Sequence, residues 1–296
     1  MAAASVGTLL MPGMPAQGAV PRSQRLHIGA QTNIWGVPIK SYNDLLRDIG
    51  ILARLGYQGF ETGLGSVSSL TGKASELRRD FASRHVQFVS AHAFAVFYDP
   101  DTVANELAGL ERAAAYTAQM GASHLIVSAS KPVPRPGGKL DLAAVRAKAE
   151  ALNRLGAAVK RNGLKLCYHN HELEFRDKPT EESYLLKETD PNLVWLCLDV
   201  GHCYGLVDPA AFTAEHFRRI AIFHLRDETR AITGEIVDTE PGYGRINLKG
   251  IVAPLLNSNW EGWLEVEEAP FYPKPVPDPE AVLKIWRAYL RKLTNV

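Results

Sequence analysis

Residues 194–199 read Val-Trp-Leu-Cys-Leu-Asp, and residues 220–224 read Ile-Ala-Ile-Phe-His. Each segment is a short apolar run of strand length that ends in one ionisable side chain. Apolar runs that allow burial on both faces are typical of parallel strands covered by helices. Six more runs of this kind occur in the chain, and we predict further strands at residues 26–30, 59–61, 87–92, 124–128, 164–169 and 262–267.

Longer amphipathic patterns lie between the predicted strands. Residues 42–55 follow Ser41, a favourable helix N-cap, and repeat apolar side chains at i, i+3 and i+4. Similar patterns occupy residues 101–120, 140–162 and 279–293. We therefore predict helices in all of these places.

The alternation of strand and helix decides the fold class. Parallel strands need helix-length crossovers, and about eight strand–helix units favour an α/β protein with a single-domain (β/α)8 TIM barrel. An open dinucleotide-binding sheet would carry Gly-x-Gly-x-x-Gly after its first strand, whereas residues 31–35 read Gln-Thr-Asn-Ile-Trp. Gly242-x-Gly244 lacks the Lys-Ser/Thr that completes a phosphate loop, so we predict a turn before a helix at residues 246–256.

The composition favours a small-molecule partner. Lys and Arg number 33 against 32 Asp and Glu, so the net charge of +1 creates no overall field that attracts nucleic acid or an anionic membrane. No stretch approaches the roughly 20 apolar residues of a membrane-spanning helix. The three cysteines, Cys167, Cys197 and Cys203, lie in or beside apolar runs without a Cys-x-x-Cys pair, so we predict buried free thiols.

The start of the chain differs from the rest. We divide the chain into a leader at residues 1–25 and a barrel domain at residues 26–296. The leader is small and apolar, and its first charged residue is Arg22. This pattern is similar to the apolar core and cleavage zone of an export signal that lacks a basic start, and it favours an exported or periplasmic protein. The alternative is a disordered, uncharged leader on a cytoplasmic enzyme.

Ionisable residues recur where the predicted strands end. Six of the eight runs close on Glu, His or Asp, namely Glu61, His92, His169, Asp199, His224 and Glu267. The carboxyl ends of barrel strands meet at one rim, and barrel enzymes carry their active sites there. Burying these groups together without a partner would be costly, and a divalent cation relieves that cost.

The last four of these residues are the strongest candidates for a metal site. They are His169, Asp199, His224 and Glu267, from the fifth to the eighth predicted strand. Two imidazoles with two carboxylates suit Mn²⁺, Co²⁺, Fe²⁺ or Zn²⁺ better than Ca²⁺, which prefers oxygen ligands. We predict one divalent metal ion, with Mn²⁺ as the first choice and Mg²⁺ as a further alternative.

Four segments carry a family resemblance. Residues 168–175 read Tyr-His-Asn-His-Glu-Leu-Glu-Phe, and residues 198–202 read Leu-Asp-Val-Gly-His. Residues 223–227 read Phe-His-Leu-Arg-Asp, and residues 266–268 read Val-Glu-Glu. In order and spacing these segments resemble the xylose isomerase-like TIM-barrel superfamily of sugar isomerases and epimerases. The resemblance implies the barrel fold and metal-dependent sugar chemistry, and it leaves the sugar open.

One departure from the family pattern concerns the fifth strand. Family members often have a Glu ligand, which also moves protons, where this chain has His169. His171 lies on the same strand face and is a candidate either to replace that base or to be the ligand itself. Asn170 and Glu172 are expected to orient the histidines. Relatives with this pattern include inosose dehydratase-like proteins and enzymes that act on 3-keto-glycosides.

The resemblance implies proton transfer next to a carbonyl. We expect the metal to polarise the carbonyl of a small keto-sugar while Glu267 or His171 removes the neighbouring proton, which gives an enediolate. Isomerisation or epimerisation of the keto-sugar is the first expectation. A 3-keto-glycoside lyase or hydrolase and an inosose-type dehydratase are the alternatives, because all of these reactions share the first step.

Further residues are expected around the substrate. Trp35, Glu61 and His92 follow the first three predicted strands and are candidates to line the sugar pocket. His202 is expected to hold a substrate hydroxyl. Arg226 is expected either to stabilise the oxyanion or to pair with a neighbouring carboxylate.

Two other classes of protein fit this sequence less well. An apurinic endonuclease shares the superfamily fold but needs a cationic DNA-binding face, which the net charge of +1 disfavours. A non-catalytic sugar-binding protein is the minor alternative, and the retention of Asp199, His224 and Glu267 disfavours it. The expected partner is thus a small-molecule sugar, and a homo-oligomer is expected because such barrels often form dimers or tetramers.

Overall fold

Eight parallel strands close into a barrel in the computed structural model, which describes residue 21 and residues 24–69, 73–268 and 275–296. The order around the barrel is β1-β10-β7-β6-β5-β4-β3-β2. The strands are β1 (Leu26–Gln31), β2 (Gly59–Gly63), β3 (Gln87–Ala95), β4 (His124–Ala129), β5 (Lys165–His169), β6 (Val194–Asp199), β7 (Ile220–Leu225) and β10 (Gly262–Val266). The predicted (β/α)8 barrel is confirmed, whereas most of the predicted leader lies outside the described residues.

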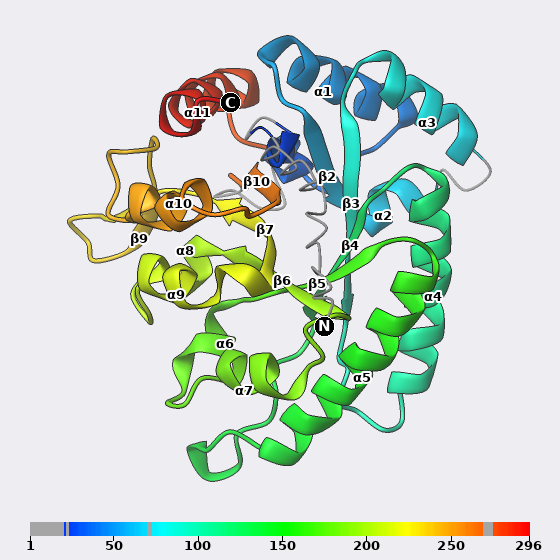
Figure 1. The fold of residues 1–296 in the computed structure, drawn as a ribbon, viewed down its shortest axis with the longest axis vertical. Helices are drawn as coiled ribbons and strands as arrows, with labels where there is room; N and C mark the ends of the chain where they lie inside the picture. Colours follow the sequence, from blue (N-terminus) through cyan, green and yellow to red (C-terminus); the bar gives the residue numbers. More distant parts are fainter. Residues whose placement is uncertain (1–20, 22–23, 70–72, 269–274) are drawn as a thin grey trace, which may run out of the picture.

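Helices surround this barrel, and in Figure 1 the C-terminal helix lies beside the first one. They are α1 (Tyr42–Leu55), α2 (Leu64–Ser68), α3 (Ala74–Ser83), α4 (Val103–Gln119), α5 (Leu142–Arg161), α6 (Glu172–Arg176), α7 (Glu181–Glu188), α8 (Val200–Cys203), α9 (Pro209–His216), α10 (Leu248–Leu256) and α11 (Pro279–Thr294). None of the described helices is long and apolar enough to cross a membrane.

Helix α1 shows how local sequence sets an element. The side chain of Ser41 accepts a hydrogen bond from the N–H of Asp44, which caps the first turn. Gly56 ends the helix with a φ of 81°, a left-handed conformation that glycine adopts without strain. The apolar stripe of the helix, which comprises Leu45, Ile49 and Leu52, is buried against the barrel. The predicted helix therefore has the bounds that its capping residues specify.

Side chains inside the barrel form an apolar layer beneath a polar one. One small buried cluster takes a residue from each of six strands, namely Val89, Ile126, Cys167, Cys197, Ile222 and Trp263. Two positions further along four of those strands stand His169, Asp199, His224 and Glu265. Because side chains two residues apart share one strand face, the apolar layer supports the polar layer at the carboxyl ends. All three cysteines are buried and free, as predicted.

A short antiparallel hairpin that was not predicted follows β7, with strands β8 (Glu228–Arg230) and β9 (Ile236–Asp238). The buried carboxylate of Asp227 accepts hydrogen bonds from the backbone N–H groups of Gly242 at 2.7 Å and Gly244 at 3.0 Å. It also accepts one from Ile246 at 3.2 Å. The Gly242-x-Gly244 segment is thus a turn fixed by an aspartate before α10, as the sequence predicted.

Candidate metal centre and its pocket

Four buried side chains meet at the carboxyl end of the barrel. They are His169, Asp199, His224 and Glu267, and ligand atoms of all four lie within 4.8 Å of one another. The Nε2 atom of His169 lies 3.6 Å from Asp199 Oδ2 and 3.7 Å from Glu267 Oε2. The Nδ1 atom of His224 lies 2.7 Å from Glu267 Oε2. The structure therefore brings together the four residues that the sequence predicted as metal ligands.

Unpartnered atoms in this cluster fit a divalent cation. Both ring nitrogens of His169, the Nδ1 atom of His224 and the Oε2 atom of Glu267 are buried without a hydrogen-bond partner. Buried polar atoms without a partner are costly, and such atoms in native proteins usually have a role. One cation bound by two imidazoles and two carboxylates would satisfy one nitrogen of each ring and the Oε2 atom of Glu267. The cluster is therefore a candidate centre for a divalent metal ion.

The carboxylate of Asp199 is held from several sides. The side chain of Asn170 accepts from the Asp199 N–H at 2.9 Å and donates to its carbonyl at 3.1 Å, so it extends the β5–β6 pairing. The Oδ1 atom of Asp199 accepts the N–H groups of Gly201 at 2.8 Å and His202 at 2.9 Å, which caps α8. Its Oδ2 atom accepts from Arg226 at 2.6 Å and faces the cluster. Local backbone chemistry thus fixes one carboxylate oxygen and leaves the other for the site.

Neighbouring charges keep the two acidic members ionised. Burial acts to raise the pKa of Asp199, but Arg226 and His202 outweigh it and lower that pKa overall. Burial likewise acts to raise the pKa of Glu267, and His224 with the other neighbours holds it well below its usual value. Burial acts to lower the pKa of His169, but the nearby carboxylates of Asp199 and Glu267 outweigh it and raise that pKa overall. At neutral pH the carboxylates are therefore in the form that binds a metal.

Arg226 pairs with both carboxylates of the cluster. Its Nη2 atom lies 2.6 Å from Asp199 Oδ2 and 3.3 Å from Glu267 Oε2. A Cβ atom at Gly201 would lie 2.1 Å from Cδ of Arg226, so glycine at this position makes room for the arginine stem. Of the two roles expected for Arg226, the structure shows the pairing with carboxylates, and the same side chain also lines the pocket.

Glu61 lies beneath the cluster and not in the pocket. Its side chain is fully buried, at 0% exposure. The Oε2 atom lies 2.8 Å from Nε2 of His224, and the Oε1 atom lies 3.2 Å from Nδ1 of His92. Burial acts to raise the pKa of Glu61, but His224 and His92 outweigh it and lower that pKa. The sequence predicted that Glu61 lines the substrate pocket, whereas in the structure its carboxylate contacts two histidines.

A pocket of about 390 Å³ opens over the cluster. It brings together five of the residues predicted to act on or bind substrate, and its polar lining comprises His92, His169, His171, His202, Arg226 and Glu267 together with Gln31 and Asn33. A concave site with convergent polar groups is the usual form of a small-molecule site. The candidate metal centre and the predicted substrate residues thus share one cavity.

His171 follows β5 and faces this pocket. Its ring centroid lies 5.0 Å from that of His169 and 4.9 Å from that of His202. Burial, with a further contribution from His169, lowers the pKa of His171 to about 3. The imidazole is therefore neutral at neutral pH, which is the form that can accept a proton.

A buried network holds the backbone of His171. The Oε2 atom of Glu174 accepts the His171 N–H at 3.0 Å, and its Oε1 atom accepts the hydroxyl of Tyr168 at 2.6 Å. Nζ of Lys148, from α5, lies 3.4 Å from Glu174 and 2.6 Å from Glu181 of α7. Lys148 is fully buried. Two helices thereby fix the segment that presents His171 to the pocket.

Three predicted residues lie elsewhere or act differently. Trp35 packs against the hydrophobic core and is not among the described residues that line the pocket. Glu172, expected to orient the histidines, is exposed. Asn170, expected to do the same, binds the backbone of Asp199 instead. Counting residues along a strand places a side chain at the rim, but it does not say which way a loop residue turns.

Residues missed by sequence reasoning also reach the pocket. Phe94, on β3, is 55% exposed and stacks on His92 with ring centroids 4.9 Å apart. Its position two residues after His92 on the same strand face was the signal available in the sequence. Asn33 donates to Oε1 of Glu267 at 3.3 Å, and Gln31 lies beside it in the lining. The first and third strands therefore contribute more to the site than the sequence indicated.

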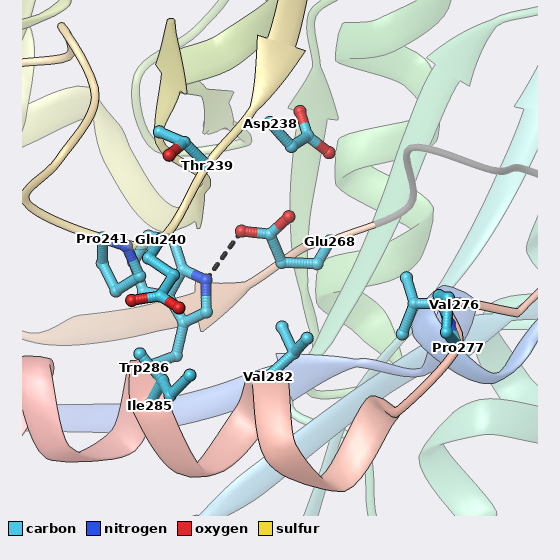
Figure 2. Close-up of a pocket in the computed structure, with 10 residues that line it drawn as sticks. All are labelled: Asp238, Thr239, Glu240, Pro241, Glu268, Val276, Pro277, Val282, Ile285 and Trp286. Atoms are coloured by element: carbon cyan, nitrogen blue, oxygen red, sulfur yellow. Dashed lines mark hydrogen bonds between the residues drawn. The ribbon is translucent and has the colours of Figure 1, made fainter.

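A second cavity, of about 210 Å³, lies between α11 and the segment after β9 (Figure 2). Much of its lining is apolar, including Val282, Ile285 and Trp286. In Figure 2 the Glu268 carboxylate points at the indole of Trp286, whose Nε1–H donates to it at 2.6 Å. None of the four candidate ligands belongs to the described lining of this cavity. The pocket over the cluster is therefore the better candidate for a reaction.

Comparison with known proteins agrees with this geometry. Residues 49–293 match the family model of the xylose isomerase-like TIM barrel. An inosose dehydratase from Clostridium perfringens is 32% identical over 165 residues, which cover 50% of this chain and 54% of the relative. An inosose dehydratase from Geobacillus kaustophilus is 26% identical over 272 residues, which cover 82% of this chain and 85% of the relative.

The chain thus spans about half the length of the first of these relatives. A solved structure of a sugar phosphate isomerase/epimerase from Parabacteroides distasonis shares the fold, with a TM-score of 0.71 at 20% identity. The match covers 94% of this chain and 98% of that structure. Because the family model matches most of its length, the chain belongs to the xylose isomerase-like TIM-barrel family.

Proposed function

We propose that this protein is a divalent-metal-dependent enzyme that removes a proton next to the carbonyl of a small keto-polyol and then eliminates water. The observation that carries the proposal is the cluster of four candidate ligands on a pocket that also presents His171 and His202. The names of the curated relatives support dehydration of a keto-cyclitol. Isomerisation or epimerisation, the first expectation from the sequence, begins with the same proton removal and is the alternative outcome.

The four clustered residues would hold the ion. When bound there, a divalent cation would supply Lewis-acid polarisation of the substrate carbonyl, which acidifies the neighbouring C–H. We propose Mn²⁺, since mixed imidazole and carboxylate ligands suit it, with Co²⁺, Fe²⁺, Zn²⁺ and Mg²⁺ as alternatives. Arg226 lies beside Asp199 and Glu267 and would stabilise negative charge that develops on substrate oxygen.

His171 is the proposed proton carrier. Its neutral ring takes the proton from the C–H bond, and the electron pair of that bond forms the carbon–carbon double bond as the adjacent C–O bond breaks. The imidazolium then returns the proton to the departing hydroxide, which leaves as water. His202, with 31% of its side chain exposed at the pocket, would hold a substrate hydroxyl.

Glu267 is assigned to the metal and not to proton removal. Its Oε2 atom lies 2.7 Å from Nδ1 of His224 and 3.3 Å from Arg226, which leaves little freedom to approach a C–H bond. Phe94 presents an exposed ring at the same pocket and is the proposed surface for the apolar face of the substrate ring, in place of Trp35.

The proposal is tested by following exchange and product together. The protein, loaded with Mn²⁺, is incubated in D₂O with a panel of inososes, keto-sugars and 3-keto-glycosides, and NMR records deuterium next to the carbonyl. Exchange that disappears with EDTA, followed by a product that has lost water (an enol or its 1,2-diketone form), supports the dehydratase. Exchange with an epimer or isomer as product moves the assignment to the alternative. Absence of exchange with every substrate, in protein that has bound Mn²⁺, rejects proton removal at this site.

A second candidate substrate class rests on a separate observation. A further hollow of about 350 Å³ adjoins the main pocket, because Phe94 and His171 line both. Its other lining residues include Lys131, Pro132 and Leu173. A substituent on the keto-ring would fit there, so a 3-keto-glycoside that loses its aglycone is the second proposal. A kcat/KM that is higher for the glycoside than for the free keto-cyclitol, and that falls in Leu173→Trp for the glycoside alone, would favour this class.

A further inference from the structure

Glu61 connects two parts of the site without touching the pocket. It stands on β2, is fully buried, and is not among the described lining residues of the cavity. Its carboxylate reaches a ring from β7 on one side and a ring from β3 on the other. Residues on strands far apart in the sequence are thus joined through one side chain.

The contact with His224 specifies which ring nitrogen carries hydrogen. A carboxylate only accepts, so the 2.8 Å contact between Glu61 Oε2 and His224 Nε2 places the hydrogen on Nε2. The other nitrogen, Nδ1, is then the one that can offer its lone pair to a metal ion. Nδ1 is the atom that faces Glu267 in the candidate metal cluster, and it has no hydrogen-bond partner. Glu61 therefore directs the lone pair of His224 at the cluster.

The same carboxylate fixes His92. Its Oε1 atom lies 3.2 Å from Nδ1 of His92, and Nε2 of that ring lies 2.6 Å from Oγ of Ser128. Nδ1 of His92 thus faces the buried carboxylate, while its Nε2 atom and the hydroxyl of Ser128 share a hydrogen bond. Ser90 also donates to Glu61 Oε2 at 3.2 Å, which holds the carboxylate in place. The Glu61 carboxylate, which is itself held in place, therefore contacts the rings of both His224 and His92.

We infer that Glu61 is a positioning residue that selects the tautomer of His224 for metal binding and holds the ring of His92 at the pocket. The inference rests on the proposed metal site. Carboxylates that orient a ligating histidine typically change metal affinity by about 10- to 100-fold when they are removed.

The test measures metal binding and the tautomer, and not turnover. Glu61→Gln keeps one acceptor oxygen for His224 but loses the charge, so Mn²⁺ affinity is expected to fall by about 10-fold. Glu61→Met keeps the volume and removes both acceptors, so a fall of about 100-fold is expected. Affinity is measured by isothermal titration of the metal-free protein with Mn²⁺, and circular dichroism checks the fold of each variant.

Glu265→Gln is the matched control. Glu265 is equally buried in the same region of the barrel, but its nearest approach to His224 Nε2 is 3.8 Å. Mn²⁺ affinity is expected to stay within about 3-fold of wild type, because this change removes a buried carboxyl without removing the bond to the ring. An equal loss in Glu265→Gln and Glu61→Gln would show a general effect of disturbing the barrel interior and would overturn the inference.

A second readout needs no metal. Long-range ¹⁵N NMR of metal-free wild-type protein, at a pH where the His224 ring is neutral, should show its hydrogen on Nε2, and Glu61→Met should lose that tautomer. An unchanged tautomer and unchanged Mn²⁺ affinity in folded Glu61→Met would overturn the inference. Wild-type protein that binds no divalent cation would instead refute the proposed metal site, and the NMR comparison would still decide the role of Glu61.

Discussion

Replacing Lys148 by Met is expected to destabilise the protein strongly, because it leaves buried carboxylates without their cation. Lys148 has 0% exposure, and its partners Glu174 and Glu181 have side chains 4% and 1% exposed. Breaking a buried ion pair by removing one partner typically costs about 3–5 kcal/mol. Met fills a similar volume, so the expected loss comes from the unpaired charge and not from a cavity.

Glu174 and Glu181 keep different partners when the Lys148 cation is removed. Glu174 retains the hydroxyl of Tyr168 and the N–H of His171, whereas Glu181 retains Arg135 at 3.7 Å. Adding Glu181→Gln to Lys148→Met should therefore recover about half of the lost stability, since it removes the carboxylate that lost its closest partner.

Urea unfolding at neutral pH, followed by circular dichroism and tryptophan fluorescence with refolding as a check, measures these differences. Lys160→Met is the control, because Lys160 lies on the same helix, is exposed, and should change stability by less than about 0.5 kcal/mol. A decrease in the free energy of unfolding of less than about 1 kcal/mol in Lys148→Met would be the value of an exposed ion pair. That result would refute the conclusion that Lys148 forms a stabilising buried ion-pair network. The same conclusion would be refuted if the double variant, Lys148→Met with Glu181→Gln, were less stable than Lys148→Met alone.

Three further predictions concern the site and its surroundings. Glu267→Gln should reduce Mn²⁺-dependent exchange in D₂O by at least about 100-fold with an unchanged circular dichroism spectrum, and retained exchange would reject its place in the site. His224→Ala should lower the bound metal after dialysis, measured by elemental analysis, and full occupancy would mean that the ligand set is wrong. Burial, with Glu174 adding to it, raises the pKa of Glu182 to about 8, so the folded chain keeps a proton that the unfolded chain releases near its ordinary value. The contribution of Glu182 to native stability should therefore fall as pH rises from about 4.5 to 8, and Glu182→Gln should make the decrease of stability over that range smaller in urea unfolding.

The sequence predicted the barrel well because each strand carries its own signal. The run at residues 194–199 becomes β6 with the same bounds, and residues 42–55 become α1. Apolar runs of strand length and capped amphipathic helices are local patterns, and closure of the sheet follows from their number. The hairpin of β8 and β9 was missed because it is short and two of its side chains, Ile236 and Val237, are exposed.

The sequence correctly placed the site residues that lie on strands, but it did not predict which way some of the side chains near strand ends face. Residues such as His224 lie on a strand, where alternation fixes which face a side chain occupies. Glu61 was expected in the pocket because it ends a short run, but β2 continues to Gly63, so Glu61 lies lower in the barrel. Trp35 follows β1 in a 3₁₀ turn, where no strand periodicity applies. These differences depend on where strands stop, which the sequence pattern does not resolve.

The side chain of Asn170 also has a consequence for motion. Because it occupies both backbone groups of Asp199, the amide proton of Asp199 is shielded although it stands at the end of a strand, where fraying is normal. Hydrogen exchange there should be as slow as in the centre of β6. Because Asn170 is the neighbour of His169 and bonds both backbone groups of Asp199, the spacing between the side chains of His169 and Asp199 should stay fixed while the strand ends around them fluctuate.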